Sequence, residues 1–158
     1  MKEVLDVCCG GKMFWFDKNN KDVLFLDIRE GKNLDEHWTM KNFQVQPDTI
    51  MDFRKLNLPS ESFNLIVFDP PHKKNLTKES ITYKKYGGLN EETWKDDISK
   101  GFDECWRVLK VGGTLVFKWN EVSFKVKEIL DCLKHKPMFG QKTTKNLKSH
   151  WLVFYKGE

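Results

Sequence analysis

Residues 63–72 read FNLIVFDPPH, an unbroken apolar run that ends in an acid, two prolines and a histidine. A continuous rather than alternating apolar run is typical of a parallel strand that is covered on both faces. Two prolines directly after such a run end its strand pairing and hold the next residues rigid. The stretch therefore predicts a buried central strand with Asp69 at its carboxyl end.

Similar apolar runs occur on both sides of this strand in the sequence. Before it lie residues 4–9 (VLDVCC), which lead into Gly10-Gly11, then residues 22–28 (DVLFLDI) and residues 49–53 (TIMDF), each with an acid near its end. After it, a fifth strand is expected over residues 114–119, and two closing strands over residues 137–141 and 150–155, the last of them antiparallel.

The segment before the fifth strand carries apolar residues at spacings of four, four, three and four, which mark one face of a helix: Trp94, Ile98, Phe102, Cys105 and Leu109. Asn90 would cap its start, and Gly112-Gly113 would stop it. Further helices are expected over residues 122–133 and, briefly, over residues 12–16. Strands alternating with helices predict an α/β fold, a single doubly wound and mostly parallel sheet with helices on both faces, in one domain spanning residues 1–158.

Composition narrows the classes of protein to consider. The chain has 158 residues and a net charge of +4, a length that suits one domain. No apolar run approaches the roughly 18 residues that a membrane span needs, and the first residues lack a signal-peptide pattern. Residues 1–71 hold 9 basic and 12 acidic side chains, whereas residues 72–158 hold 18 and 11. The basic second half suggests a polyanionic partner.

The four cysteines are Cys8, Cys9, Cys105 and Cys132. They form no C-x-x-C pair, no metal-ligand spacing with histidine and no dense disulfide pattern. Small buried side chains in a reducing cytoplasm are the expected interpretation, and no metal site is expected.

Four chemically suggestive positions fall at predicted strand ends. Ligands of doubly wound sheets bind at the carboxyl ends of the strands, near the point where strand order reverses. Gly10-Gly11 lets a ligand approach the backbone closely, although neither a G-x-G-x-x-G nor a P-loop motif is present. Asp27 could accept both hydroxyls of a ribose, with Glu30 as the rival if that strand is longer, and Asp52 could accept from an adenine amino group. Each acid could instead cap a helix or form a turn.

The most specific feature is Asp69-Pro70-Pro71-His72. The Pro70 carbonyl is free of helix pairing, the Asp69 carboxylate is a second acceptor, and the His72 ring can stack. This combination would fit a planar substrate that bears an NH₂ group. A proline-rich turn without a ligand is the structural alternative.

The residues that follow, 73–90, are long for a connection, basic and interrupted by glycine, which favours a mobile substrate loop. Its lysines and tyrosines Tyr83 and Tyr86 could contact phosphates and stack on bases, or the segment could be merely solvated. Residues 134–148 add five lysines and no acid, which fits phosphate contact or simple solubility.

From Val4 to Tyr155 the chain resembles the class I S-adenosylmethionine-dependent methyltransferases, which have a Rossmann-like fold. Within that class, residues 69–72 resemble the D/N-P-P-aromatic motif of amino-methyltransferases that act on adenine N6 or cytosine N4. The resemblance implies S-adenosyl-L-methionine as cofactor, with site residues as follows: Asp6, Cys8 and Gly10 at its methionine part, Asp27 at its ribose, Asp52 and Phe53 at its adenine, and Asp69, Pro70, Pro71 and His72 at the target amine.

The chain departs from that pattern in three places. Cys8-Cys9-Gly10-Gly11 replaces a more glycine-rich turn, and His72 stands where a tyrosine, phenylalanine or tryptophan is typical, so it could stack or accept a proton. The chain also resembles a minimal core without a target-recognition domain.

The function that the resemblance implies is methylation of a nucleobase amino group in DNA or RNA, with adenine N6 favoured over cytosine N4. A nucleic acid is then the expected partner, together with a specificity subunit or a second copy of the chain, and no membrane. Two alternatives remain open: methylation of a small molecule or a protein side-chain amide, and a non-catalytic subunit.

Overall fold

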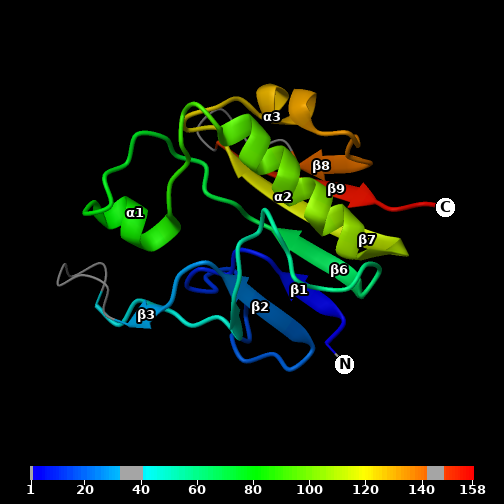
Figure 1. Ribbon diagram of the computed structural model, residues 1–158, viewed down its shortest axis with the longest axis horizontal. Helices are drawn as coiled ribbons and strands as arrows, with labels where there is room; N and C mark the ends of the chain where they lie inside the picture. Colours follow the sequence, from blue (N-terminus) through cyan, green and yellow to red (C-terminus); the bar gives the residue numbers. More distant parts are fainter. Residues whose placement is uncertain (1, 33–40, 142–147) are drawn as a thin grey trace.

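The computed structural model describes residues 2–32, 41–141 and 148–158. Seven strands form one sheet in the order β5-β2-β1-β6-β7-β9-β8 (Figure 1). Their bounds are β1 Val4–Asp6, β2 Val23–Asp27, β5 Thr49–Ile50, β6 Phe63–Phe68, β7 Leu109–Asn120, β8 Phe139–Gln141 and β9 Ser149–Tyr155. A separate two-stranded hairpin pairs β3, Gly31–Lys32, with β4, Gln44–Val45. The helices are α1 Ile81–Tyr86, α2 Trp94–Val108 and α3 Val126–Cys132.

The sheet is parallel from β5 to β7 and antiparallel at its last two pairings. The chain moves outward from β1 through β2 to β5, and then returns to the other side of β1 to form β6. This reversal of strand order is the point where doubly wound sheets bind ligands. The predicted α/β fold and the antiparallel last strand are confirmed, and β8 also pairs antiparallel with β9.

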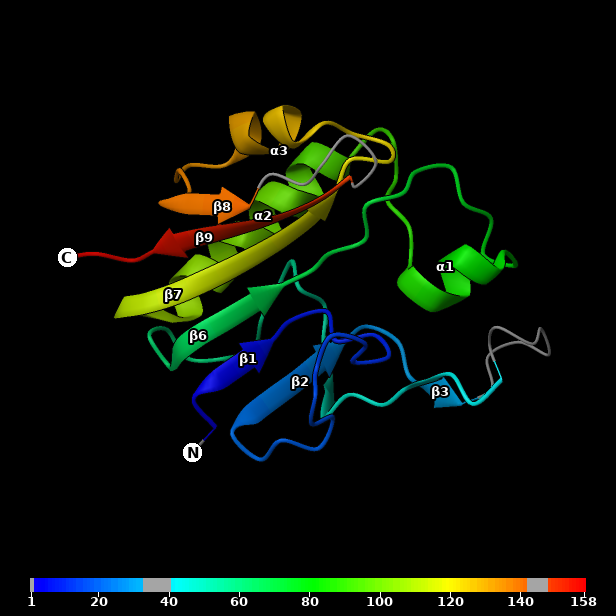
Figure 2. The same ribbon diagram turned by 180° about the vertical axis from the view of Figure 1, so that it is seen from behind.

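The main core lies between the sheet and helices α2 and α3, which pack on the same face of it (Figures 1 and 2). Burying apolar side chains from both layers supplies the main stabilisation. The sheet contributes Leu5, Leu26, Ile66, Leu115 and Phe117, and the helices contribute Ile98, Phe102, Cys105 and Ile129. Alternate residues of β2 point to opposite faces, so Leu26 belongs to this core while Val23 and Phe25 form a second, smaller cluster.

Aromatic side chains, rather than a helix, pack on the second face, against β2 and β9. The ring of Trp15 meets Phe25 edge-on at 5.3 Å, and Phe14 meets Trp151 at 5.6 Å. The helix expected over residues 12–16 is wrong, because Lys12 has a φ of +52°, in the left-handed region, and the segment forms consecutive turns instead. Helices were expected on both faces of the sheet. Within the described residues, α2 and α3 pack on one face, and no helix packs on the other.

The helix boundaries also differ from expectation. Residues 91–93 form turns and α2 begins at Trp94, although the Asn90 side chain does accept a hydrogen bond from the Glu92 backbone N–H. At the other end α2 stops at Val108, and β7 begins at once and includes Gly112-Gly113. Gly112 has a φ of +80°, which a glycine adopts without strain inside this irregular part of the strand. The glycines therefore lie within the strand and not at the helix end.

The segment 73–90 contains helix α1, which the sequence did not predict. The Ser80 hydroxyl oxygen caps it by accepting from the Tyr83 N–H at 3.1 Å. The two ends of the segment are joined, because the Leu89 N–H donates to the Lys73 carbonyl at 2.8 Å. Figure 1 shows α1 beyond the arrowheads of β1, β2 and β6. No helix in the described ranges is both long and apolar enough to cross a membrane.

Candidate functional site

A cavity of about 480 Å³ opens at the carboxyl ends of β1, β2, β5 and β6. It lies where strand order reverses, as expected for this sheet class. The structure brings together nearly all of the predicted site residues along its wall, namely Cys8, Gly10, Asp27, Asp52, Phe53, Asp69, Pro70, Pro71 and His72. Asp6 and Glu30 are the candidates that do not line it.

Asp6 lies behind the wall of the cavity. Its side chain is fully buried, with one oxygen accepting from the Trp15 indole N–H at 2.7 Å and the other from the Cys8 N–H at 3.3 Å. Burial raises the pKa of this carboxyl to about 7, and the bond from Trp15 acts in the opposite direction. Asp6 therefore braces the turn after β1 and has no surface on the cavity.

The two glycines of this turn serve different purposes. Gly10 has a φ of +48°, and its N–H donates to Asp27 Oδ2 at 2.9 Å, which ties the turn to the end of β2. A side chain at Gly11 would place its Cβ 2.6 Å from the Phe43 ring, so Gly11 is needed for close packing. Beside them, burial raises the pKa of the Cys8 thiol, which leaves a neutral side chain on the cavity wall.

Both carboxylate oxygens of Asp27 accept two hydrogen bonds each. Oδ1 accepts from the backbone N–H and the Nε of Arg29, at 2.9 and 3.0 Å, and Oδ2 accepts from Gly10 and from Arg29 Nη2, at 2.9 and 3.2 Å. Arg29 Nη1 also donates to the Lys84 carbonyl in α1 at 3.1 Å. A ribose could bind Asp27 only by replacing part of this guanidinium contact, so Arg29 links the acid at the end of β2 to the helix above the cavity.

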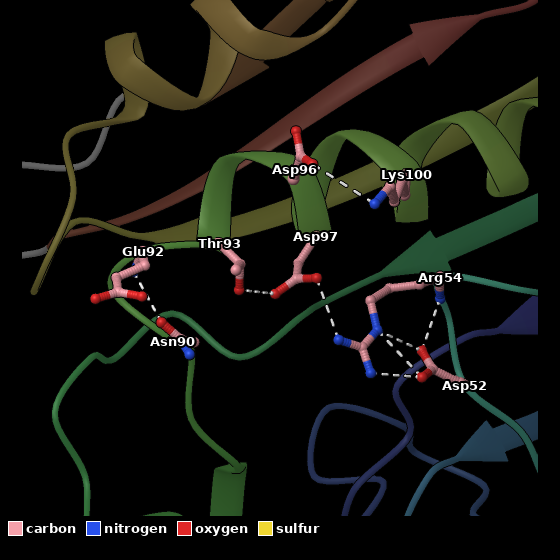
Figure 3. A network of polar contacts seen from close by, with 8 residues as sticks. All are labelled: Asp52, Arg54, Asn90, Glu92, Thr93, Asp96, Asp97 and Lys100. Carbon is pink, nitrogen blue, oxygen red and sulfur yellow. Dashed lines mark hydrogen bonds and ion pairs between the residues drawn. The ribbon is translucent and has the colours of Figure 1, made fainter.

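Asp52 is held by Arg54, as Figure 3 shows. Arg54 Nη2 donates to Asp52 Oδ2 at 2.6 Å, and its Nη1 reaches Asp97 in α2 at 3.1 Å. The Thr93 hydroxyl donates to the second oxygen of Asp97 at 2.9 Å. The bonds from Arg54 lower the pKa of Asp52, so the carboxylate stays charged. Arg54 and Asp97 also line the cavity, and the sequence reasoning missed both because nothing in their local pattern marks them.

Asp69 is paired with Lys118, a residue of the neighbouring strand β7. Lys118 Nζ donates to Asp69 Oδ2 at 2.7 Å, whereas Oδ1 has no hydrogen-bond partner in the described part of the chain. Burial raises the pKa of Asp69, and the Lys118 ammonium opposes that rise. Lys118 was also missed, although a lysine inside the apolar run of residues 114–119 was a signal that could have found it.

His72 lies in the turn that follows β6 and lines the same cavity as Asp69 and Lys118. Its ring meets the buried Trp119 edge-on at 6.3 Å. Burial, together with the charges of Lys118 and Lys73, lowers the pKa of His72 to about 4, while a hydrogen bond to the Pro70 backbone acts in the opposite direction. The imidazole is therefore neutral at neutral pH and offers a flat, uncharged ring.

Helix α1 and the residues after it form the outer wall of the cavity. Tyr83, Lys85 and Tyr86 line it, together with the glycines of residues 87–88. Gly87 has a φ of +72°, and a Cβ there would lie 3.1 Å from Pro71 Cγ, so the loop sits directly against the proline turn. Two of the five lysines of residues 134–148, Lys142 and Lys145, lie outside the described residues.

The next question is whether the charged groups of the site could bind a metal ion. Among the described residues, no group of three or more His, Cys, Asp or Glu side chains could hold a metal ion. The carboxylates of the cavity are instead matched with basic partners, Asp27 with Arg29, Asp52 with Arg54 and Asp69 with Lys118.

No protein-family model matches the sequence, and no curated protein matches it. Solved structures are similar, however. The PH0226 protein from Pyrococcus horikoshii OT3 has a TM-score of 0.62 at 14% identity, over 98% of this chain and 81% of that chain. A SAM-dependent methyltransferase from Methanosarcina mazei has a TM-score of 0.56 at 14% identity, over 97% and 92% of the two chains. A TehB-like SAM-dependent methyltransferase from Corynebacterium glutamicum has a TM-score of 0.54 at 15% identity, over 98% and 80%.

These likenesses concern the fold. The chain has the Rossmann-like fold found in S-adenosylmethionine-dependent methyltransferases, which are its structural neighbours.

Proposed function

We propose that the chain is an S-adenosylmethionine-dependent methyltransferase whose acceptor is the exocyclic amino group of a nucleobase, adenine N6 ahead of cytosine N4. The observation that carries the proposal is a single cavity shared by Asp27 and the Gly10 turn on one side and by Asp69-Pro70-Pro71-His72 on the other. Methyl transfer needs both reactants in one such cavity, because holding them in line supplies much of the rate.

In this proposal the cofactor lies along the ends of β1, β2 and β5. Its methionine part follows Cys8 and Gly10, and its ribose hydroxyls bind Asp27 in exchange for part of the Arg29 contact. Its adenine lies against Phe53, beside the carboxylates of Asp52 and Asp97 that Arg54 holds. When bound, the cofactor supplies an electrophilic methyl group.

The target amine lies at the end of β6. Asp69 Oδ1 and the Pro70 carbonyl would accept the two N–H bonds of a planar NH₂ group and stabilise the positive charge that develops on its nitrogen. Lys118 holds the other oxygen of Asp69 and thereby fixes the carboxylate plane. The neutral His72 ring would stack on the base, the interpretation that its lowered pKa favours over proton acceptance. A base in a duplex would have to flip out of the stack to reach this site.

One observation favours a second candidate, methylation of a small molecule. The Lys118 ammonium lies in the cavity wall, with its Nζ 5.6 and 5.7 Å from the ring centroids of Phe14 and Trp151. A small acidic acceptor could bind Lys118 in place of Asp69. Nucleobases lack such a group, so the two candidates differ in whether the acceptor is anionic.

The test is transfer of a labelled methyl group from S-adenosylmethionine to duplex DNA, single-stranded DNA, tRNA, rRNA and a protein extract, followed by nucleoside analysis. We expect label in N6-methyladenine, and we expect Asp69→Asn to remove transfer because the carboxylate is lost. The matched control is Asp96→Asn, which changes an exposed acid of α2 that pairs only with Lys100 across 3.5 Å among the described residues. Label confined to protein or to small molecules would overturn the nucleobase assignment.

A further inference from the structure

A second cavity of about 290 Å³ adjoins the first at the glycine turn. Gly10, Gly11, Met13 and Lys85 line both cavities, so the two share a wall. The second cavity is formed by the turn after β1, by residues 41–46 around β4 and by Lys85 of α1. No sequence motif pointed to it, because its residues come from three separate segments.

The charged side chains that line this second cavity in the described residues are all lysines. Four lysines line it, namely Lys12, Lys18, Lys41 and Lys85, and no carboxylate does so among the described residues. Two of them are held in place. Lys12 Nζ donates to the Lys18 carbonyl at 3.2 Å and lies over the Phe25 ring, while Lys85 Nζ lies 5.7 Å from the Phe43 ring centroid. Lys18 and Lys41 are exposed and make no ion pair within the described ranges.

Amide side chains complete the lining. Asn19, Asn42, Gln44 and Gln46 also line the cavity, and none of these side chains is hydrogen-bonded to another group in the described part of the chain. Ammonium and amide donors can together bind an anion with several acceptor oxygens, and phosphate is the common biological example. The Phe43 ring packs against Gly11, and both residues line the cavity.

We infer that this cavity binds backbone phosphate groups of a nucleic-acid substrate, next to the nucleotide whose base enters the first cavity. The inference rests on the proposed function, which places a nucleobase beside Asp69 and His72. Phosphate contacts position a strand and carry no sequence information, so this site sets register while the first cavity selects the base. Lys85 of α1 lines both cavities, and Tyr83 and Tyr86 of the same helix line the first, so α1 borders the path between them.

The experiment measures binding of fluorescein-labelled 12-nucleotide single-stranded DNA and RNA by anisotropy, without cofactor, over a series of salt concentrations. The variant is Lys18→Gln with Lys41→Gln, and the control is Lys95→Gln with Lys127→Gln. The control lysines lie at the surface of α2 and α3, and the net charge changes by the same amount. All four positions are at the surface, so folding should be preserved, which circular dichroism verifies.

We expect the Lys18/Lys41 variant to bind on the order of tenfold more weakly near 0.1 M salt, and its salt-dependence slope to fall by about 1.4, because each lost phosphate contact removes about 0.7 for a single strand. The control should keep the wild-type slope. Equal loss in both variants, or no loss in either, would overturn the inference, as would wild-type protein that binds no oligonucleotide.

Two further measurements test this inference independently of the proposed function and distinguish a nucleic-acid strand from a small phosphorylated ligand. Calorimetry with S-adenosylmethionine should give the same affinity for wild type and the Lys18/Lys41 variant, since neither lysine lines the first cavity. Oligonucleotide binding without cofactor binding would contradict the proposed function alone. Micromolar binding of inorganic pyrophosphate, with displacement of the oligonucleotide, would assign the cavity to a small phosphorylated ligand and overturn the strand assignment.

Discussion

Lys118 affects the ionisation of Asp69, the residue that we propose accepts a hydrogen bond from the target amine. Asp69 is largely buried, and burial alone would favour its protonated form, which accepts hydrogen bonds poorly. The Lys118 ammonium at 2.7 Å favours the carboxylate instead. Lys118 thus acts through Asp69, as a residue that maintains its charge and orientation.

Replacing Lys118 by methionine should raise the pKa of Asp69, because the neighbouring positive charge is lost while burial persists. We expect the acidic limb of the pH profile of kcat/KM for methyl transfer to move upward by about 1–3 pH units. Lys118→Arg, which keeps the charge, should leave the limb close to its wild-type position. An unshifted limb in Lys118→Met would show that Asp69 does not depend on this partner.

Asp6 is the second residue whose ionisation matters, here for stability. Its pKa is about 7 in the folded chain, whereas an exposed carboxyl of this type has a pKa of 3.8. The folded state therefore binds the proton more tightly than the unfolded state does. Below pH 4 both states are protonated, and as the pH rises from about 4 to about 7 the stability that this group contributes is lost.

Asp6→Asn removes this titration. The wild-type free energy of unfolding should decrease by up to about 1.4 kcal/mol per pH unit between pH 4 and 7 relative to the variant. Above pH 7 the difference between the two proteins should become constant. Urea unfolding at a series of pH values measures it, and parallel pH dependences for the two proteins would contradict the assignment of a raised pKa to Asp6.

At the scale of elements, helix α2 links the core to the wall of the cavity. Gly101 lies in the middle of α2, where a Cβ would stand 2.3 Å from Phe53 Cδ2 and 2.9 Å from Phe68 Cζ. The glycine therefore lets the helix approach the sheet closely enough for Phe53, a cavity residue, to pack between them. Phe68 is fully buried, which limits how far its ring can move.

Gly101→Ala should lower the free energy of unfolding by about 1–3 kcal/mol through overpacking. A decrease in the free energy of unfolding would indicate overpacking, because the same change at an exposed helix position would increase it by about 1 kcal/mol. Lys100→Ala, on the adjacent exposed position, should change stability by less than about 0.5 kcal/mol. A variant Gly101→Ala as stable as wild type in urea would show that α2 can move away from Phe53 at little cost.

The same scale shows why some elements could not be predicted from sequence. Periodicity identified α2 and the strands of the seven-stranded sheet, since their apolar faces are dictated by burial, but it did not indicate the short hairpin of β3 and β4. It failed at residues 12–16, where the Trp15 indole bonds to Asp6 and Lys12 takes up a left-handed conformation, both set by tertiary contacts. Helix α1 has no buried side chain, so it leaves no apolar pattern to detect.

For the whole molecule, topology accounts for most of the site. Gly10, Asp27, Asp52 and Asp69 lie at or just after the carboxyl ends of different strands, and the parallel arrangement alone brings them to one edge. The order of strands and helices in the sequence is enough to predict this grouping. The partners Arg29, Arg54 and Lys118 could not be predicted in the same way, except for the polar interruption of β7, because which basic side chain reaches which acid depends on register and side-chain packing.

Calorimetric titration with S-adenosylmethionine is the direct test of the cofactor site that we propose at the carboxyl ends of β1, β2 and β5. We predict one cofactor per chain, and at least about tenfold weaker binding for Asp27→Asn, since hydrogen bonds to a charged group contribute about 1.5–3 kcal/mol. Asp22→Asn, an exposed acid just before β2, should bind like wild type. Wild-type protein that binds no cofactor would contradict the proposed cofactor site, and Asp27→Asn protein that binds it as well as wild type would contradict the role of Asp27 in that site.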